Sequence, residues 1–331
     1  MEERCKVVCL TPVFNEEWII EKFLLAASVW ADIIIISDQG STDKTVEIAS
    51  KFPKVRLIDN SILREYDENA YRLPLYNEVK KIEGKKLIFQ LDADEFLTPN
   101  FDDLEWKTMK ESPVGTRFIF NWYNIQPNFI SYFMDEKPLA YIYDGRDYNC
   151  GILHQLRIPV SSEDSFVKLN SIGVLHYQFL NWERMELKQM WYRMYEKVIF
   201  PKKHFITIWR MYHFDKNLPI DTSKIYPISK DWINGYNRFG IEITSYKKIN
   251  ERQWDERMIN YILKYGWKRF KRIDVKTYHI LRSDKENRLQ NIKLKYNIMD
   301  RILIRYLSAT QKYKEKNRIK VTDYILMKIF K

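Results

Sequence analysis

Two carboxylates with one residue between them follow a strongly apolar run in the stretch Leu87–Asn100. The run predicts a buried strand, and at the end of a strand alternate side chains point the same way. Asp92 and Asp94 would then face one point, where two negative charges repel each other unless a cation lies between them. Mg²⁺ and Mn²⁺ prefer such oxygen ligands and often share them with phosphate oxygens. The pair therefore predicts either a divalent metal site that neutralises a departing diphosphate or a solvated acidic loop.

The elements around this pair alternate between strand and helix over the first hundred residues. Apolar runs predict strands at 6–15, 32–38, 54–60 and 85–95, and helical spacing predicts helices at 16–28, 42–52 and 69–81, the last with Pro74 in its first turn. Buried strands separated by helices indicate an α/β fold with a parallel sheet covered on both faces. Ligands of such sheets bind at the carboxyl ends of the strands, where Thr11–Pro12, Asp38–Gln39 and Asp92–Asp94 should meet.

The remaining sequence has a different pattern. Residues 114–125 and 170–180 are predicted to form strands, with loops rich in Tyr, Asn and Asp between them. From Trp182 the spacing becomes helical, and Pro201 should end the first helix. Its buried stripe is predicted to consist of Leu187, Met190, Trp191, Met194, Tyr195 and Val198. Further helices are expected near 251–272, 294–310 and 321–331.

Composition sets limits on the partners and the compartment. The net charge is +11, but residues 1–180 carry 20 Lys and Arg against 28 acids, whereas residues 181–331 carry 35 against 16. A basic second half favours phosphate-bearing partners such as anionic lipid, although Lys and Arg could also simply solvate helices. Cys5 and Cys9 lie about 13 Å apart on one expected strand, too far for a disulfide, and with Cys150 the count is odd. We therefore expect a reducing, cytoplasmic compartment, with neither a signal peptide nor a membrane span.

The motifs "TPVFNEE", "SDQGSTDKT", Arg72 and "LDADEF" occur in this order within residues 5–105. This arrangement resembles the family-2 glycosyltransferases. The resemblance implies a Rossmann-like GT-A nucleotide-sugar-binding domain with a helical C-terminal extension. It divides the chain into a nucleotide-sugar-binding half at 1–115, an acceptor-side half at 116–180 and a basic helical region at 181–331.

The resemblance also implies roles for single residues. It implies a nucleotide pocket lined by Thr11, Pro12, Asn15 and Glu16, a base or ribose contact from Asp38, a donor contact from Arg72, a ribose or sugar contact from Asp92, and a metal ligand at Asp94. Gln39 replaces the second Asp of the usual "DDGSTD" segment, which leaves the base specificity open.

A second pair of patterns is similar to a bacterial polysaccharide-type subgroup of the family. These are "YDGRDYNCGILHQLRIP" and "GVLHYQFLNWERMELKQMWYRMYE". The similarity implies His176 as a further metal ligand, and His154 and Arg157 as contacts to the diphosphate or the acceptor. A core histidine and a surface loop are the structural alternatives.

The general base is the least defined part of the site. An inverting single displacement requires a base for the acceptor hydroxyl. We predict Asp144, with His154 second, and Asp147, Glu163 and Asp135 as the other carboxylates to consider.

Together these patterns and the resemblance to the family imply a metal-assisted inverting hexosyltransferase. It would use Mn²⁺ or Mg²⁺, a UDP-, GDP- or dTDP-sugar donor, and a saccharide or polyprenyl-linked acceptor. A nucleotidyltransferase and a nucleic-acid-binding protein are the alternatives, but the first lacks its Gly-rich loop and the second leaves the acidic strand ends unexplained. Basic aromatic segments such as "WKRFKR" predict peripheral attachment to the inner membrane face, and the oligomeric state stays open.

Overall fold

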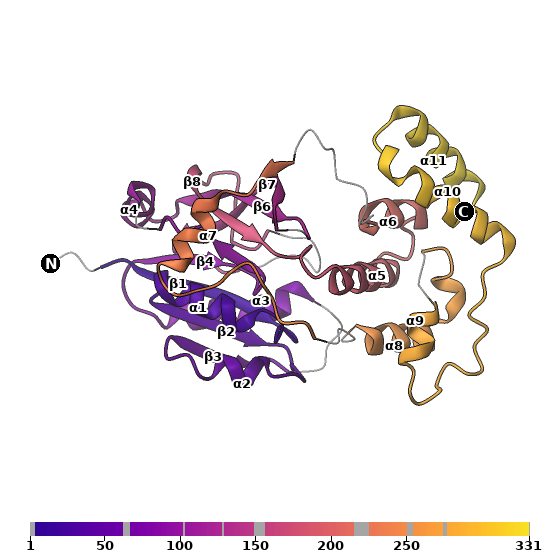
Figure 1. The fold of residues 1–331 in the computed structure, drawn as a ribbon, viewed down its shortest axis with the longest axis horizontal. Helices are drawn as coiled ribbons and strands as arrows, with labels where there is room; N and C mark the ends of the chain where they lie inside the picture. The colour runs from indigo at the N-terminus through magenta and orange to yellow at the C-terminus, as the bar shows by residue number, and fades with distance from the viewer. Residues whose placement is uncertain are drawn as a thin grey trace. The chain divides into compact units, whose positions relative to one another are not determined.

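The computed structural model describes residues 4–61, 67–101, 103–127, 129–148, 156–214, 225–249, 254–273 and 277–330. The chain divides into two compact units (Figure 1). Unit 1 consists of Met1–Leu180 and Lys224–Ile249, and unit 2 consists of Asn181–Ser223 and Asn250–Lys331. The division after residue 180 coincides with the predicted start of the C-terminal region.

Unit 1 is built on one sheet, which has nine strands among the described residues. The strands are β1 (Lys6–Val13), β2 (Ile33–Asp38), β3 (Val55–Asp59), β4 (Lys86–Gln90), β5 (Glu95–Leu97), β6 (Arg117–Ile125), β7 (Ser131–Ile142), β8 (Phe166–His176) and β9 (Tyr226–Pro227). Their order is β3-β2-β1-β4-β7-β6-β8-β5, and β9 pairs with β7.

The first half of the sheet is parallel, as predicted. β1 pairs in parallel with β2 and β4, and β2 pairs in parallel with β3. Side chains alternate along β1, so that Cys9 packs in the core cluster of α1 (Ile20–Trp30), whereas Leu10 packs with Leu75 of α3 (Glu68–Lys80) on the opposite face. α2 (Thr45–Ala49) connects β2 and β3. The predicted α/β architecture, with helices on both faces, is therefore confirmed.

The second half of the sheet is mixed, and the predicted loop between residues 126 and 169 was partly wrong. This region contains β7, which pairs antiparallel with β4 and with β6, whereas β6 and β8 are parallel. The sequence of β7 obscures its strand character, because Met134 and Asp135 are both exposed and Pro138 interrupts the run. Pro138 lies where the β6–β7 register shifts, a position at which a strand tolerates a residue without an N–H group.

Pro74 lies inside α3 and not in its first turn, which corrects the predicted start of that helix. The helix begins after Asp67, whose side chain accepts hydrogen bonds from the N–H groups of Asn69 and Ala70. Pro74 cannot donate to the carbonyl of Ala70 four residues earlier. The side chain of Asn60 donates to this carbonyl at 3.1 Å, so the acceptor that proline leaves open is satisfied.

The predicted C-terminal region also needs a correction, because residues 224–249 return to unit 1. This segment carries α7 (Lys230–Asn237), and the hydroxyl of Tyr236 donates to the carbonyl of Leu97 at 2.7 Å. A Cβ atom on Gly235 would lie 2.4 Å from a side-chain carbon of Pro99, so only glycine permits this packing. α4 (Leu104–Glu111) follows β5 and contributes Trp106 to the same core cluster as Tyr236.

Unit 2 is helical. It contains α5 (Trp182–Ile199), α6 (Phe205–Tyr212), α8 (Asp255–Tyr265), α9 (Thr277–Ser283), α10 (Ile298–Thr310) and α11 (Asn317–Ile329), with single 3₁₀ turns at Trp267–Arg269 and Gln311–Tyr313. Most of the predicted stripe on α5 is buried, and α5 ends before Pro201 as predicted. Among the described helices, none has the length and apolar character that a membrane crossing requires. Cys5 and Cys9 are both free thiols.

Candidate functional site

Strand direction brings the candidate residues to one edge of the sheet in unit 1. β1, β2 and β4 all end at this edge, and β6 and β8 run parallel to each other and antiparallel to β7. β7 runs antiparallel to β4, so β7 begins here and β6 and β8 end here. We call this the carboxyl edge. Its strand ends carry Asp38, Asp92 and His176, and the opposite end of the sheet is called the amino edge.

Two loops at the carboxyl edge are joined by hydrogen bonds. The backbone of Asn15 adopts a φ of 52°, a conformation that asparagine tolerates better than most residues. Its N–H donates to Ser41 Oγ at 2.9 Å, and its side-chain oxygen accepts from the N–H of Thr42 at 2.7 Å. The N–H of Glu16 donates to Thr45 Oγ1 at 2.7 Å. The loops that follow β1 and β2 therefore form one connected wall.

Asp38 stabilises the second loop of this wall, which follows β2. Its buried carboxylate accepts hydrogen bonds from the N–H groups of Gly40 and Ser41 at 3.1 Å. Gly40 has a φ of +87°, which L side chains rarely adopt, so the turn depends on this glycine. Gln39 follows with a partly exposed side chain, while its N–H donates to the carbonyl of Val13 at 2.9 Å. Thr11 is fully buried beneath the wall and Pro12 is partly exposed.

The next group consists of charged side chains around the end of β4. Arg157 Nη2 lies 2.8 Å from Asp92 Oδ2, and its Nη1 contacts Glu95. Arg72 Nη2 lies 4.0 Å from Asp92 Oδ1, and Arg72 Nη1 donates to Glu68 at 3.1 Å. Burial opposes the charge on Arg72 and Arg157, but their carboxylate neighbours raise the pKa of both above the usual range. The structure thus brings together Arg72, Asp92 and Arg157, which the sequence placed in one site.

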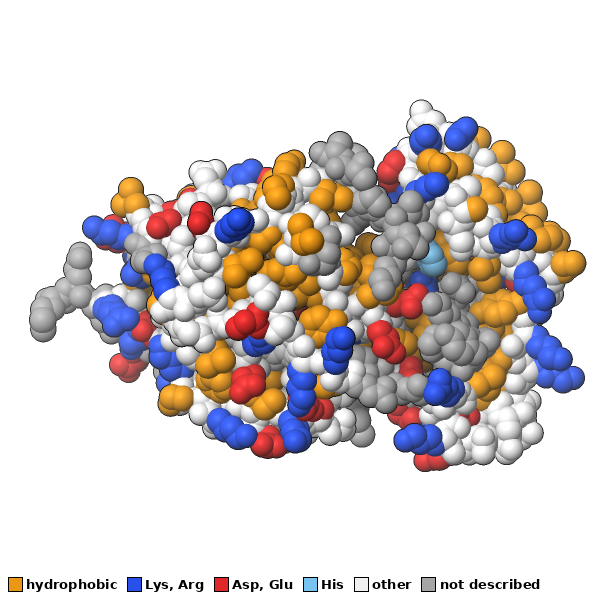
Figure 2. Space-filling view, in the orientation of Figure 1, with side chains coloured by type: hydrophobic (Ala, Val, Ile, Leu, Met, Phe, Trp, Pro, Cys, Tyr) orange, Lys and Arg blue, Asp and Glu red, His pale blue; other side chains and the backbone are white. Residues whose placement is uncertain are grey.

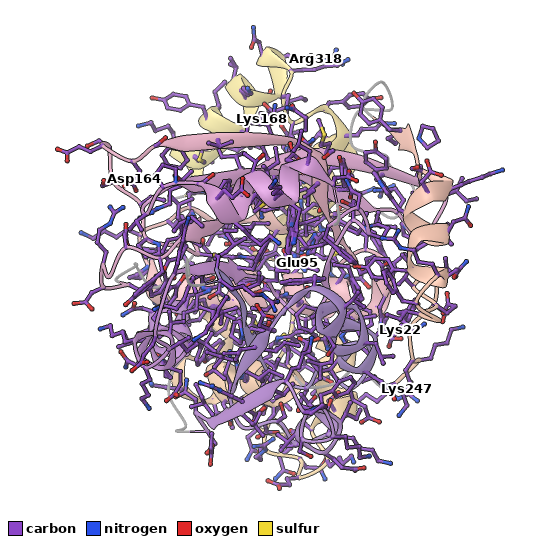
Figure 3. All side chains as sticks on the ribbon, turned by 90° about the vertical axis from the view of Figure 1, so that its left-hand side faces the viewer. Lys22, Glu95, Asp164, Lys168, Lys247 and Arg318 are labelled. Atoms are coloured by element: carbon purple, nitrogen blue, oxygen red, sulfur yellow. The ribbon has the colours of Figure 1, made fainter. Side chains whose placement is uncertain are left out.

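Glu95 is the fully buried centre of this group, and Figure 3 shows it in the interior of the molecule. Trp122 Nε1 donates to its Oε1 at 2.8 Å, and the N–H of Asp92 donates to its Oε2 at 2.9 Å. Burial raises the pKa of Glu95, and the attraction of Arg157 opposes this rise only in part. Glu95 therefore fixes the positions of Asp92, Trp122 and Arg157. Its own negative charge is destabilised by burial.

Asp94 and His176 lie next to each other at the same edge. His176 Nε2 is 3.8 Å from Asp94 Oδ2, and both side chains are buried. His176 Nδ1 lies 2.8 Å from Asn124 Oδ1, while Asn124 Nδ2 donates to Asp135 Oδ2 at 3.2 Å. A carboxylate can only accept, so Asp135 orients the amide of Asn124 with its oxygen toward the histidine. The Nδ1 atom then donates this hydrogen bond, and Nε2 faces Asp94.

These residues fit a divalent ion. A neutral imidazole whose other nitrogen donates to a fixed acceptor, beside a carboxylate, is a common ligand arrangement. Among the residues that the structure describes, no group of three or more His, Cys, Asp or Glu side chains is placed to hold a metal. An ion at Asp94 and His176 would therefore complete its coordination with water and with oxygens of a ligand, as Mg²⁺ usually does.

The sequence reading missed Trp122 and Lys137. The ring of Trp122 stacks on His176 with 4.0 Å between centroids, and Lys137 Nζ lies 3.2 Å from the centroid of Trp122. Burial, followed by repulsion from Arg157, lowers the pKa of Lys137 to about 8. Lys137 lies on β7, which the sequence patterns did not predict as a strand. The alternation of Trp122 and Asn124 in "FNWYN" is the signal that could have indicated polar side chains on one face of β6.

Asp144 does not lie with this group, which corrects its prediction as general base. It follows β7 at the amino edge, where the N–H of Tyr143 donates to the carbonyl of Lys86 at the first residue of β4. The length of β4 alone separates this point from the carboxyl edge by roughly 13 Å. Asp144 Oδ2 is bound by Arg117 at 2.8 Å and by Arg146 at 2.6 Å. Partial burial opposes ionisation, but these hydrogen bonds lower the pKa of Asp144, which makes it a weak base.

The other predicted bases have different positions. Asp135 is exposed and lies near the start of β7, at the carboxyl edge. Asp147 pairs with Lys80 in an exposed ion pair. His154 lies outside the described residues.

Comparisons with known proteins identify a similar family for part of the chain. Residues 8–149, which is less than half of the chain, match the family model described as Glycosyl transferase family 2. Together with the sheet topology, this match confirms the predicted GT-A-type fold of unit 1. It also supports a glycosyltransferase domain in this part of the chain. A search of curated proteins found no match.

Solved structures with partial similarity include glucosyl-3-phosphoglycerate synthase from Mycobacterium tuberculosis. Its complex with Mn²⁺, UDP and glucosyl-3-phosphoglycerate is 20% identical, with a TM-score of 0.28 over 36% of this chain and 44% of that chain. Its complex with Mn²⁺ and UDP-glucose is 18% identical, with the same TM-score and the same coverage. This chain thus spans less than half of the length of those proteins.

Proposed function

We propose that the protein is an inverting glycosyltransferase that transfers a sugar from a nucleotide-diphosphate donor to a saccharide or lipid-linked saccharide acceptor. The observation that carries the proposal is the contact between Asp94 and His176 at the carboxyl edge, 3.8 Å apart, beside the wall formed by the loops after β1 and β2. The family match over residues 8–149 supports the same reaction class. We further propose that the donor carries a hexose and that the acceptor belongs to a bacterial polysaccharide.

The wall would hold the nucleotide. Thr11, Pro12, Asn15 and Glu16 come from its first loop, and Asp38 and Gln39 come from its second. Asp38 uses its carboxylate to support the turn at Gly40, so its contact to a base or ribose would have to come from a remaining lone pair. Gln39 has a partly exposed amide that can both donate to and accept from a base.

The charged group would hold the diphosphate and the sugar. A bound Mn²⁺ or Mg²⁺ at Asp94 and His176 would neutralise negative charge on the diphosphate. Arg157 would exchange part of its contact with Asp92 for a phosphate oxygen, since guanidinium groups bind phosphate bidentately. Asp92 would then be released toward the ribose or the sugar, with Arg72 as its remaining cationic neighbour.

The acceptor hydroxyl needs a base at the same edge, and we propose Asp135 in place of Asp144. Asp135 is exposed, and Asn124 donates a single hydrogen bond to one of its oxygens at 3.2 Å. The other oxygen can accept a proton from an incoming hydroxyl. Asp135→Asn should lower turnover by roughly 100-fold with a much smaller fall in donor affinity, the latter because Asp135 also orients the amide of Asn124, and an equal fall in donor affinity would make Asp135 a binding residue instead.

The test of the whole proposal is a donor screen. UDP-, GDP- and dTDP-sugars are added with and without Mn²⁺, and Tm is measured by differential scanning fluorimetry together with nucleotide release. One nucleotide class should raise Tm in a Mn²⁺-dependent way, because a ligand that binds the folded state stabilises it by mass action. Asp94→Asn should remove the Mn²⁺ dependence. If none of these donors changes Tm or is hydrolysed, the proposed reaction is wrong.

A further inference from the structure

Helix α10 in unit 2 presents an apolar face to solvent. Ile298, Met299 and Ile302 are 74%, 48% and 57% exposed, and their spacing places them on one side of the helix. The opposite side buries Leu303 and Leu307. The helix therefore has its core-facing stripe and, in addition, a second apolar stripe that stays exposed beside the described residues of unit 2.

Helix α11 has the same property. Val321, Ile325 and Ile329 follow one another at intervals of four residues and are 58%, 51% and 66% exposed. Ile319 and Asp323 on the other side are buried. An exposed row of β-branched aliphatic side chains over three turns is unusual for a helix that only has to remain in solution.

The acidic residues of these helices point inward. Asp323 is bound by Arg210 and accepts from the hydroxyl of Tyr306 at 3.0 Å, which joins α10 to α11. Asp300 is buried and pairs with Arg272 at 3.0 Å. Among the described residues from 297 to 330, the third acid is Glu315, which is exposed and pairs with Lys320. The negative charges of this region are therefore neutralised inside unit 2 or at its edge.

The exposed charges beside the apolar rows are cationic. They are Arg301 and Arg305 on α10, and Arg318, Lys320 and Lys328 on α11. Figure 2 shows hydrophobic and basic side chains interspersed over the surface that α10 and α11 form, and Figure 3 shows Arg318 extending outward from α11. We call this surface, made of these five cations with Ile298, Met299, Ile302, Val321, Tyr324, Ile325 and Ile329, the α10–α11 face.

We propose that the α10–α11 face docks on an anionic lipid bilayer. The interfacial zone of a bilayer takes up aliphatic side chains, and anionic headgroups attract the Lys and Arg side chains around them. One partner then contacts both the aliphatic rows and the cations of the face. The docking does not depend on the reaction in unit 1, and it concerns a surface on which none of the proposed site residues lies.

Other partners satisfy only half of the face. A second copy of the chain would cover the aliphatic rows but would bring the same cations against each other, which is unfavourable. A nucleic acid would neutralise the cations but would leave exposed aliphatic side chains against phosphates. The combination of aliphatic rows with an excess of cations therefore favours a lipid surface.

The test is vesicle flotation of the full chain with phosphatidylcholine vesicles, with and without phosphatidylglycerol. The wild type should float with the anionic vesicles, and added salt should weaken the binding because the cations contribute to it. Ile325→Ser combined with Ile329→Ser should weaken binding by roughly 10-fold or more, because two aliphatic side chains no longer enter the bilayer. Arg318→Gln combined with Lys328→Gln should weaken it and reduce its dependence on salt.

The matched control is Leu104→Ser combined with Val114→Ser. These side chains are 78% and 64% exposed but belong to unit 1. The control variant should float like the wild type. Equal flotation of the Ile325/Ile329 variant and the wild type would overturn the proposal, as would flotation that does not depend on phosphatidylglycerol. A wild type that does not float but forms a dimer, which the Ile325/Ile329 substitutions dissociate, would assign the face to a second copy instead.

Discussion

The two edges of the sheet in unit 1 each carry a cluster of arginines and carboxylates, and the clusters differ in how their charges are paired. At the amino edge Arg117 and Arg146 bind Asp144 and Asp164, two cations against two anions. Burial opposes the charge on both acids, yet the arginines lower the pKa of each. Every member of this cluster therefore stabilises the charge of its partners.

In the cluster at the carboxyl edge, the charged forms of two members are instead destabilised. The pKa of Glu95 is raised and the pKa of Lys137 is lowered, in each case chiefly by burial. Both shifts mean that the charged form is destabilised where it lies. Groups held in this way are typical of sites that receive a charged ligand, whereas mutually satisfied pairs are typical of structural networks. The comparison thus supports a structural role for the amino edge and the proposed ligand site at the carboxyl edge.

The clearest test of this difference between the edges is to neutralise one carboxylate at each edge. Asp94→Asn should lower Mn²⁺-dependent donor hydrolysis by roughly 1000-fold, because the metal loses a charged ligand, while the fold stays intact. Asp144→Asn should change hydrolysis by less than about 10-fold but should lower the urea midpoint, because Arg117 keeps its burial and loses an ionic partner. Steady-state rates and urea unfolding of both variants provide the measurements. A large loss of activity in Asp144→Asn with unchanged stability would reverse the assignment.

Removing the cation at the amino edge should have the next largest effect. Arg117 is fully buried and its Nε also donates to the carbonyl of Pro159 at 2.7 Å. Arg117→Met should destabilise the protein by about 3 kcal/mol or more, because Asp144 and Asp164 are left without a buried partner. The acids of the wild type have folded-state pKa values below their unfolded values, so their contribution exists at neutral pH and is lost as the pH falls through the folded-state pKa. Urea unfolding at pH 7 and pH 4 should therefore show a smaller difference for Arg117→Met than for the wild type.

Sequence patterns predicted the carboxyl edge well where each residue belongs to a motif at the end of a parallel strand. Asp94 and His176 lie next to each other, because β5 begins directly after Asp94 and pairs with the end of β8, whereas Asp92 contacts Arg72 and Arg157. The patterns failed for Asp144, which lies between β4 and His154 in the sequence but follows β7. This strand runs against β4 and carries the chain across the whole sheet to the other edge. The direction of one unrecognised strand therefore decided which carboxylates could belong to the site.

The same missed strand explains why Lys137 was not predicted. A lysine in a supposed polar loop gives no signal, whereas a lysine on a strand beside Trp122 is buried against an aromatic ring. The return of residues 224–249 to unit 1 could not be predicted either. It depends on packing of Gly235 against Pro99, a contact between positions that are distant in sequence and that no local pattern records.

The pH dependence of stability should distinguish the edges in a third way. Lys137 faces Arg157, which repels it, and Glu95, Asp92 and Asp135, which attract it, with burial as the dominant influence. Its folded-state pKa of about 8 lies below the model-peptide value near 10.4. The unfolded chain then binds more protons between these values, so stability should rise with pH from about 8 to 10.

Lys137→Met tests this expectation because it removes the titrating group and keeps the aliphatic chain over Trp122. The rise should be at most about 3 kcal/mol in the wild type and should disappear in the variant. Urea unfolding at pH 7.5 and 10 measures both, with Lys168→Met as the control, since Lys168 is exposed and pairs with Glu136. A rise of the same size in Lys137→Met would place its origin elsewhere.

The smallest effect concerns Asn124, which would act on the proposed metal site through its hydrogen bond with His176. Asn124→Ala removes the acceptor for His176 Nδ1–H, so the ring can adopt the other tautomer, in which Nε2 carries the proton and cannot bind a metal. Stacking on Trp122 keeps the ring in place, and the fold should be little affected. Mn²⁺ affinity, measured by calorimetric titration without donor, should fall by roughly 10-fold. Asn121→Ala is the matched control, because alternate residues of β6 point to opposite faces of the sheet. If both variants lose the same affinity, the loss reflects damage to β6, and the hydrogen bond from His176 to Asn124 has no special role at the carboxyl edge.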